Sequence, residues 1–79
     1  MIHARDDYNR IQDPENKIGQ DEPVFLIRAK DAVSPAAVRA WAELNWVAGG
    51  DELLTNAAYT QAQRMEEWQL KYGKKLADL

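Results

Sequence analysis

The chain has 79 residues, of which 46% are hydrophobic, and 10 lysines and arginines against 13 aspartates and glutamates give it a net charge of −3. The absence of cysteine and the single histidine, His3, exclude disulfides and thiolate or histidine metal sites, and the mild acidity excludes non-specific nucleic-acid binding. A single domain of this size gains only about 3–5 kcal/mol from its core, which leaves oligomerisation or partner binding as the remaining source of stability.

The first part of the chain, residues 1–23, is polar and carries turn signals at Asp13-Pro14 and Gly19. We interpret it as an N-terminal arm. It is either docked on the rest of the protein or a loosely packed tail.

A strand is predicted over residues 24–30, which are apolar and β-branched at their start. A lone strand cannot satisfy its own backbone donors and acceptors while its side chains are buried. Its partner comes from residues 1–20, from a second copy across a two-fold axis, or from the sheet edge of another protein; a solvent-facing segment is the remaining alternative. Charges around Asp13 and Pro14 disfavour the first, and we favour the second. The residues assigned to strand pairing are Val24, Leu26 and Arg28.

A helix is predicted over residues 35–48. Ser34 and Pro35 form a strong start signal, because a serine hydroxyl caps a free amide and proline tolerates the first helical position. Gly49-Gly50 ends the helix. The face expected to be buried contains Ala37, Val38, Trp41, Leu44, Asn45 and Ala48.

A second helix is predicted over residues 51–72. Asp51 and Glu52 place negative charge at its start, which suits the helix dipole, and Gly73 ends it. The short glycine connection makes the two helices an antiparallel hairpin. The stripe expected to be buried contains Leu54, Ala58, Gln61, Met65, Trp68 and Tyr72.

These elements predict one domain over residues 1–79 with an α+β fold that is mostly α: a polar arm, one short β-strand and a helical hairpin. Trp41 and Trp68 lie on the two facing stripes and are expected in the core. Trp46 lies nearly opposite its stripe, so an oligomer, a ligand or the N-terminal arm must cover it. With Tyr59 and Leu70, which extend the same patch, it forms the predicted partner-binding site.

Catalytic groups are missing from the sequence. His3 alone cannot form a triad with a nucleophile, and Glu66 and Glu67 are adjacent on a helix and therefore diverge. Gly49-Gly50 follows a helix and lacks the spacing of a phosphate-binding loop. We expect no enzymatic activity, no metal and no cofactor.

One polar set suggests an alternative ligand, because guanidinium groups and an aromatic ring are what a phosphate and a base require. A dimer that joins two such sets can hold a nucleotide in its seam. The aspartates Asp6, Asp7 and Asp13 can instead neutralise the same arginines as ion pairs. The candidate nucleotide-binding residues are Arg5, Tyr8, Arg10 and Arg28.

Three segments carry a resemblance to known proteins: residues 5–14 (RDDYNRIQDP), 21–31 (DEPVFLIRAKD) and 38–42 (VRAWA). Together they resemble small uncharacterised proteins of tailed bacteriophages and bacterial mobile elements. The similarity covers most of the chain, including Met65, Trp68 and Asp78-Leu79. It implies a phage or prophage origin and a place in the host bacterial cytoplasm, and it carries no activity. Small phage proteins are often inhibitors of host defence or of host enzymes.

The function predicted from these features is a non-enzymatic, phage-type binding protein that occupies a macromolecular surface as a homo-oligomer and inhibits a host defence system or host enzyme. The first alternative is an oligomeric sponge for a signalling nucleotide, and the second is a structural or assembly component of a virion. The apolar runs are too short to span a bilayer, and the charged N-terminus is unlike a signal peptide. We therefore expect a cytoplasmic protein with a host protein as its partner and no contact with membranes.

Overall fold

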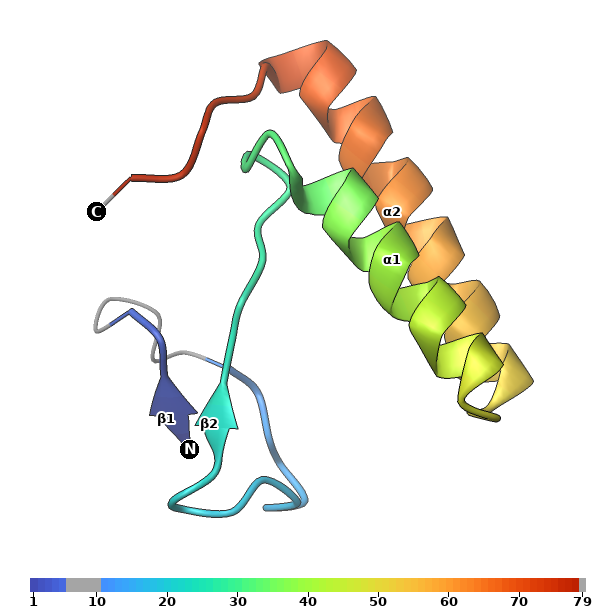
Figure 1. The fold of residues 1–79 in the computed structure, drawn as a ribbon. Coiled ribbons are helices and arrows are strands. Elements are labelled where there is room, and N and C mark those ends of the chain that lie inside the picture. The colour runs from blue at the N-terminus through green and yellow to red at the C-terminus, as the bar shows by residue number, and fades with distance from the viewer. Residues whose placement is uncertain (6–10, 79) are drawn as a thin grey trace.

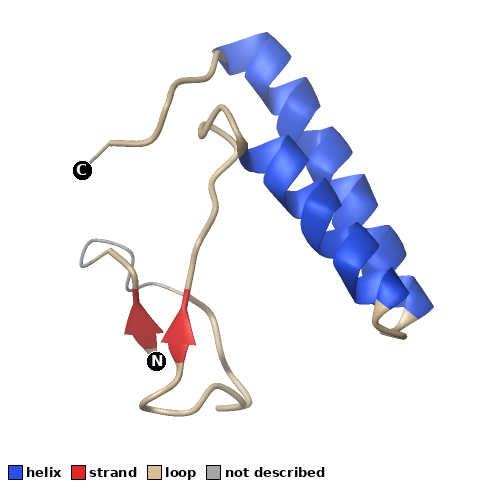
Figure 2. Cartoon of the chain, in the orientation of Figure 1, coloured by secondary structure: helices blue, strands red, loops and turns tan. Residues whose placement is uncertain are grey.

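The computed structural model describes residues 1–5 and 11–78, which form two short strands followed by two long helices (Figure 1). Strands β1 (Ile2–His3) and β2 (Pro23–Val24) form a small sheet. Helices α1 (Ser34–Val47) and α2 (Glu52–Tyr72) pack against each other as an antiparallel hairpin. The fold is therefore α+β and mostly helical, as predicted (Figure 2).

The strand partner comes from within the chain. β1 and β2 run parallel, with Ile2 opposite Pro23 and His3 opposite Val24. The expectation that a second copy pairs with the strand is therefore wrong for these residues. The charges that disfavoured an internal partner lie in the connection instead, where the Asp13 carboxylate accepts hydrogen bonds of 2.9 and 3.0 Å from two amides of the following turn.

The strand is also shorter than the predicted range of 24–30. Residues 25–28 continue without regular secondary structure and lead to a turn at residues 29–30. The ladder ends at Val24 because β1 has only two residues, so Leu26 and Arg28 lie beyond it.

The start of α1 differs from the prediction. The Ser34 hydroxyl, expected to cap the helix, instead donates a 3.4 Å hydrogen bond to the Ala29 carbonyl, and the N-cap residue Val33 has no side-chain cap. Asp31 makes the turn into the helix, because its carboxylate accepts from the Val33 amide at 3.2 Å and its carbonyl from the Ser34 amide at 2.9 Å. Pro35 lies in the first turn, as expected.

The ends of α2 follow the sequence signals. Asp51 is the N-cap residue, and its carboxylate accepts a 2.9 Å hydrogen bond from the Leu54 amide. Gly73 ends the helix with a φ of 90°, and Gly49 has a φ of 85° in the connection, a region that glycine adopts without steric strain. Both helices keep their predicted bounds to within one residue.

Small residues form the seam between the two helices. Ala42 of α1 and Ala62 of α2 are fully buried, and Thr55 is 3% exposed. The Thr55 hydroxyl donates to the Asp51 carbonyl at 2.9 Å and accepts from the Asn45 side-chain amide at 3.0 Å. The Asn45 amide and the Thr55 hydroxyl at the seam are therefore hydrogen-bonded to each other, and the hydroxyl is also bonded to the start of α2.

The large apolar side chains lie outside this seam. Trp41 and Trp68 are 47% and 38% exposed, so the prediction that they fill the core is wrong. Small residues let two helices approach closely, and a helix turns about 100° per residue, so a neighbouring position already lies on the flank. Sequence periodicity located the apolar side of each helix but not the line of contact. Other exposed members of the predicted stripes are Leu44, Ala48, Leu54, Gln61 and Tyr72.

The surface of the chain is large for its mass. It measures 6461 Å² for 9.0 kDa, whereas a compact chain of this mass exposes about 4,900 Å². The Cα radius of gyration of 13.8 Å likewise exceeds the roughly 11.6 Å of a compact domain. The excess of about 1,600 Å² arises because the hairpin has one seam and the N-terminal segment extends away from it (Figure 1).

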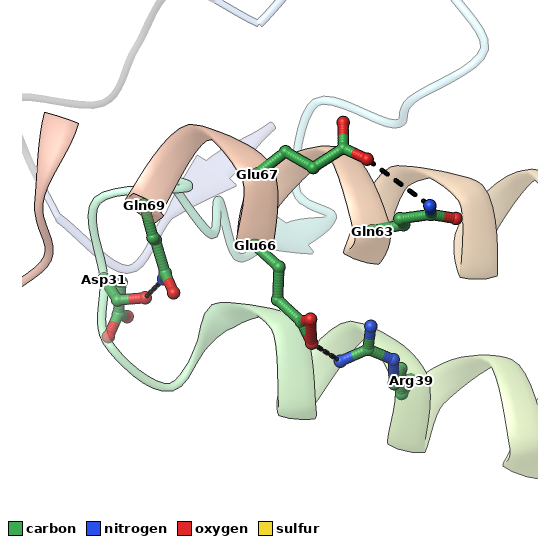
Figure 3. A network of polar contacts seen from close by, with 6 residues as sticks. All are labelled: Asp31, Arg39, Gln63, Glu66, Glu67 and Gln69. Atoms are coloured by element: carbon green, nitrogen blue, oxygen red, sulfur yellow. Dashed lines mark hydrogen bonds and ion pairs between the residues drawn. The ribbon is translucent and has the colours of Figure 1, made fainter. Parts of the chain in front are cut away.

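A clamp joins the N-terminal segment to the hairpin. The Gln69 side-chain amide donates hydrogen bonds of 2.8 and 2.9 Å to the carbonyls of Ala29 and Asp31, the second of which is drawn in Figure 3. The Ala32 amide donates to the Lys75 carbonyl at 2.7 Å, and the Lys75 amide donates back to the same segment at 3.0 Å. The turn before α1 is thus held between α2 and the residues that follow it.

Candidate functional site

An ion pair marks one side of the hairpin. The Arg39 guanidinium of α1 bonds the Glu66 carboxylate of α2 across the seam (Figure 3). This hydrogen bond lowers the pKa of the Glu66 carboxyl from its ordinary value. The pair therefore identifies the flank of α1 and the flank of α2 that lie on the same side of the hairpin.

Trp46 and Tyr59 belong to the same side as the ion pair. Trp46 follows Arg39 by seven residues and Tyr59 precedes Glu66 by seven, and a spacing of seven is about two helical turns. We call the surface formed by Arg39, Trp46, Tyr59 and Glu66 the mixed face, because it combines two aromatic rings with two opposite charges.

The two aromatic residues of the mixed face lie at similar heights along the hairpin. The hydrogen bond between Asn45 and Thr55 places these two residues at the same height along the hairpin, next to Trp46. Tyr59 lies four residues beyond Thr55, which is about 6 Å along the axis. The structure therefore brings Trp46 and Tyr59 onto one surface, as their assignment to a single site requires.

Leu70 is separated from these two residues. It lies on the same flank of α2, but eleven residues after Tyr59, which is about 16 Å along the helix, and the Arg39–Glu66 pair lies between them. It is 90% exposed and lines a shallow depression together with Gln69 and Lys74. The three predicted partner-binding residues thus fall into two parts.

The N-terminal arm does not act as a lid over Trp46 in the described part of the chain. Trp46 is 56% exposed. It lies near the connection between the helices, whereas β1 and β2 lie away from that end of the hairpin (Figure 1).

The opposite side of the hairpin is mostly apolar, and its charges lie at its edge: the Lys71 ammonium is 5.2 Å from the centroid of the Tyr72 ring, and the Arg64 guanidinium donates a 3.4 Å hydrogen bond to the Gln61 side chain. Trp41 follows Arg39 by two residues and Trp68 follows Glu66 by two, which turns each about 200° away from the ion pair. The Trp68 and Tyr72 rings pack with centroids 5.0 Å apart. We call this side the uncharged face. Its residues are Val33, Ala37, Trp41, Leu44, Ala48, Leu54, Ala57, Gln61, Met65, Trp68 and Tyr72.

A cavity of about 160 Å³ lies where the N-terminal segment meets the residues after α2. The Lys75 ammonium is 3.2 Å from the Asp78 carboxylate, so part of the positive charge around the cavity is balanced there. The cationic residues that line the cavity are Arg5, Arg28, Lys30 and Lys75, and they are joined by Phe25, Leu26, Asp31, Ala77 and Asp78.

The cavity contains half of the predicted nucleotide set. Arg5 and Arg28 come together, whereas Tyr8 and Arg10 lie outside the described residues. Lys75 was not predicted, since nothing local in the sequence relates it to an arginine 47 positions earlier. Its place follows from the backbone bonds between residues 30–32 and 75.

Within residues 1–5 and 11–78, no group of His, Asp or Glu side chains gathers in a way that can hold a metal ion. No helix in the same ranges is long and apolar enough to cross a membrane. No family model matches the sequence, and neither a curated protein nor a solved structure matches it.

Proposed function

We propose that this chain is a non-enzymatic, phage-type binding protein that acts in the host cytoplasm as a homo-oligomer and inhibits a host defence system or host enzyme by occupying its surface. The observation that supports this most is the position of the aromatic side chains. Trp41, Trp46 and Trp68 lie on the outside of a hairpin whose fully buried side chains are small. Large exposed apolar patches on a small protein mark interaction sites.

The mixed face is the surface that we assign to the host target. Tryptophan and tyrosine are enriched among residues that dominate binding energy, and their contacts are strongest when a polar rim surrounds them. Trp46 and Tyr59 have such a rim in Arg39 and Glu66. The matching partner is a host protein with an apolar pocket for the indole ring and charges opposite in sign to this pair.

The resemblance to phage proteins supports the biological setting of this proposal. It rests on residues 21–31 and 38–42 together with the N-terminal pattern. A small phage protein without catalytic groups acts on its host by binding, and inhibition is the simplest result of binding.

The test compares Trp46→Asp with Val47→Asp in capture experiments from host lysate. Val47 is 77% exposed and directly follows Trp46, but it points away from the mixed face. We expect a host protein to be captured by the wild type and by Val47→Asp, and to be lost with Trp46→Asp. Binding of the purified candidate is then measured by calorimetry, where we expect Trp46→Asp to weaken affinity by at least about 2 kcal/mol, roughly 30-fold.

The proposal fails if the two variants capture the same proteins with the same affinity. It also fails if no protein binds to any of the three chains. Both variants must keep the helical circular dichroism of the wild type, so that a loss of binding reports on the surface.

A second candidate function, a sponge for a signalling nucleotide, has support from the cationic cavity. Four cationic side chains and Phe25 surround it. Its volume of 160 Å³ is below the roughly 300 Å³ of pockets that enclose whole ligands. The cavity therefore suits a phosphate group, with the rest of the nucleotide lying outside it or against a second copy.

A thermal-shift titration tests this second candidate. If the cavity binds phosphate groups, the unfolding temperature rises with the concentration of cyclic or linear nucleotides, by an amount equivalent to about 4 kcal/mol at a thousandfold excess over Kd. Arg28→Ala should remove the rise, while Arg64→Ala, a change on the exposed surface of α2, should leave it. A flat titration for the wild type rejects the sponge.

A further inference from the structure

We infer that the uncharged face is a homodimer interface, on which two hairpins pack face to face across a two-fold axis. The inference deepens the proposed function, which includes a homo-oligomer, by assigning the oligomer contact to one face and the host target to the other. It rests on the chemistry of the two faces and on the surface area of the chain.

The chemistry of the two faces differs in the way that permanent and transient interfaces differ. The eleven positions of the uncharged face contain no charged residue and a single amide, Gln61, while the charges of Arg64 and Lys71 lie at its edge. The mixed face carries Arg39 and Glu66 beside its aromatic rings. Obligate homodimer interfaces are strongly apolar, whereas surfaces that bind reversibly are more polar. The uncharged face is therefore the permanent contact.

The area of the chain matches this assignment. The surface of 6461 Å² exceeds that of a compact chain by about 1,600 Å². Part of this excess belongs to the N-terminal segment that extends away from the hairpin, so a dimer of two hairpins buries less than all of it. Half of the excess already equals the roughly 800 Å² per partner of a standard interface.

We assign a second copy of the chain, rather than a different protein, to the uncharged face, because the hairpin needs this face buried for its own stability. Among the described residues its fully buried apolar side chains are Ala42 and Ala62, and a core of this size stabilises a chain poorly. A second copy is always present at the concentration of the chain. A two-fold axis places the same face on both partners and yields a four-helix arrangement. Trp41, Leu44 and Trp68 then fill its centre.

The first test is the mass of the purified protein in solution, measured by sedimentation equilibrium over a range of concentrations. We expect twice the chain mass of 9.0 kDa for the wild type. Leu44→Glu and Leu70→Glu form a matched pair, since both leucines are largely exposed in one chain, at 69% and 90%. Leu70 lies four residues after Glu66, on the flank of the ion pair, and two residues after Trp68, which turns it away from the uncharged face.

The two variants give distinct outcomes. Leu44→Glu should halve the mass or remove the helical circular dichroism, whereas Leu70→Glu should change neither. Either effect of Leu44→Glu supports the inference, because an exposed leucine in an isolated chain tolerates this change to within about 0.5 kcal/mol. A wild-type protein that sediments as a monomer throughout overturns it, as do identical results for the two variants.

A second test avoids charge changes and uses the absence of cysteine. Gln61→Cys places a thiol on the uncharged face and Gln63→Cys places one on the flank of the ion pair, and both glutamines are exposed in one chain. In the dimer, the thiol at position 61 should react with a maleimide at least about tenfold more slowly than the thiol at position 63. Equal rates at high protein concentration overturn the inference.

These measurements use purified protein alone. The dimer can therefore fail while capture of a host protein by Trp46 succeeds, and the reverse is equally observable. Trp46→Asp should keep the mass of the dimer, which separates the two faces directly.

Discussion

Replacement of Ala42 by leucine is expected to lower the free energy of unfolding by about 1–3 kcal/mol. Ala42 is fully buried in the seam. Three additional carbon atoms at this point force the helices apart, since a close-packed interface has no space to accept them. The bond between Asn45 and Thr55, at 3.0 Å, lengthens as a result. Urea denaturation at a fixed protein concentration measures the change.

Ala40→Leu provides the control for this prediction. It makes the same substitution in the same helix, at a position that is exposed. Its effect should stay within about 0.5 kcal/mol. If the two variants unfold at the same urea concentration, Ala42 does not lie at the line of close contact between α1 and α2.

Replacement of Gln69 by alanine is expected to lower the free energy of unfolding by about 1–3 kcal/mol. The Gln69 side-chain amide donates to two carbonyls, at 2.8 and 2.9 Å, and the variant loses both of these hydrogen bonds. Each carbonyl keeps one bond from Ser34, at 3.4 Å to Ala29 and 2.9 Å to Asp31. The damage should be local, so amide hydrogen exchange is the more informative measurement. The amides of Ala32 and Lys75, which bond within the same clamp, should exchange faster while those of Ala42 and Ala62 change less.

Gln63→Ala serves as the matched variant. Gln63 is also on α2, and its only bond in the described chain is a 3.3 Å contact with Glu67 on the surface. It should leave the exchange of Ala32 and Lys75 unchanged. Equal acceleration in both variants would show that α2 has been weakened as a whole and that no clamp exists.

The helices were predictable because their ends depend on local chemistry. Asp51 caps α2 with its own carboxylate, and Gly73 ends it in a conformation that few other residues adopt. Such signals act over three or four residues and can be read in order. The predicted bounds of both helices therefore agree with the structure to within one residue.

The line of contact between the helices was not predictable in the same way. Trp41 and Trp68 dominate the apolar pattern by size, and any periodicity weighted by hydrophobicity points to them. The seam instead follows Ala42 and Ala62, whose small volume allows close approach. Only the pairing of two helices in space reveals which positions meet.

Contacts between distant segments explain the remaining differences. The role of Gln69 was not predicted, because its partners are carbonyls that no sequence pattern identifies. A partner strand from residues 1–20 was considered but disfavoured, because the two residues of β1 give no periodic signal and charges surround Asp13 and Pro14. For the candidate site, the exposure of Trp46 could be inferred from its own helix. Its separation from Leu70 could not, because it depends on how the two helices align, as the ion pair between the two residues shows.

The clamp also determines the order in which this chain can fold as it is made. Gln69 lies 40 and 38 residues after the two carbonyls that it binds. At ribosomal speeds of 5–20 residues per second, these carbonyls wait roughly two to eight seconds for their partner. During that interval the turn before α1 has only its local hydrogen bonds, because the hairpin still lacks the end of its second helix. The N-terminal segment therefore joins the hairpin only after α2 has been made.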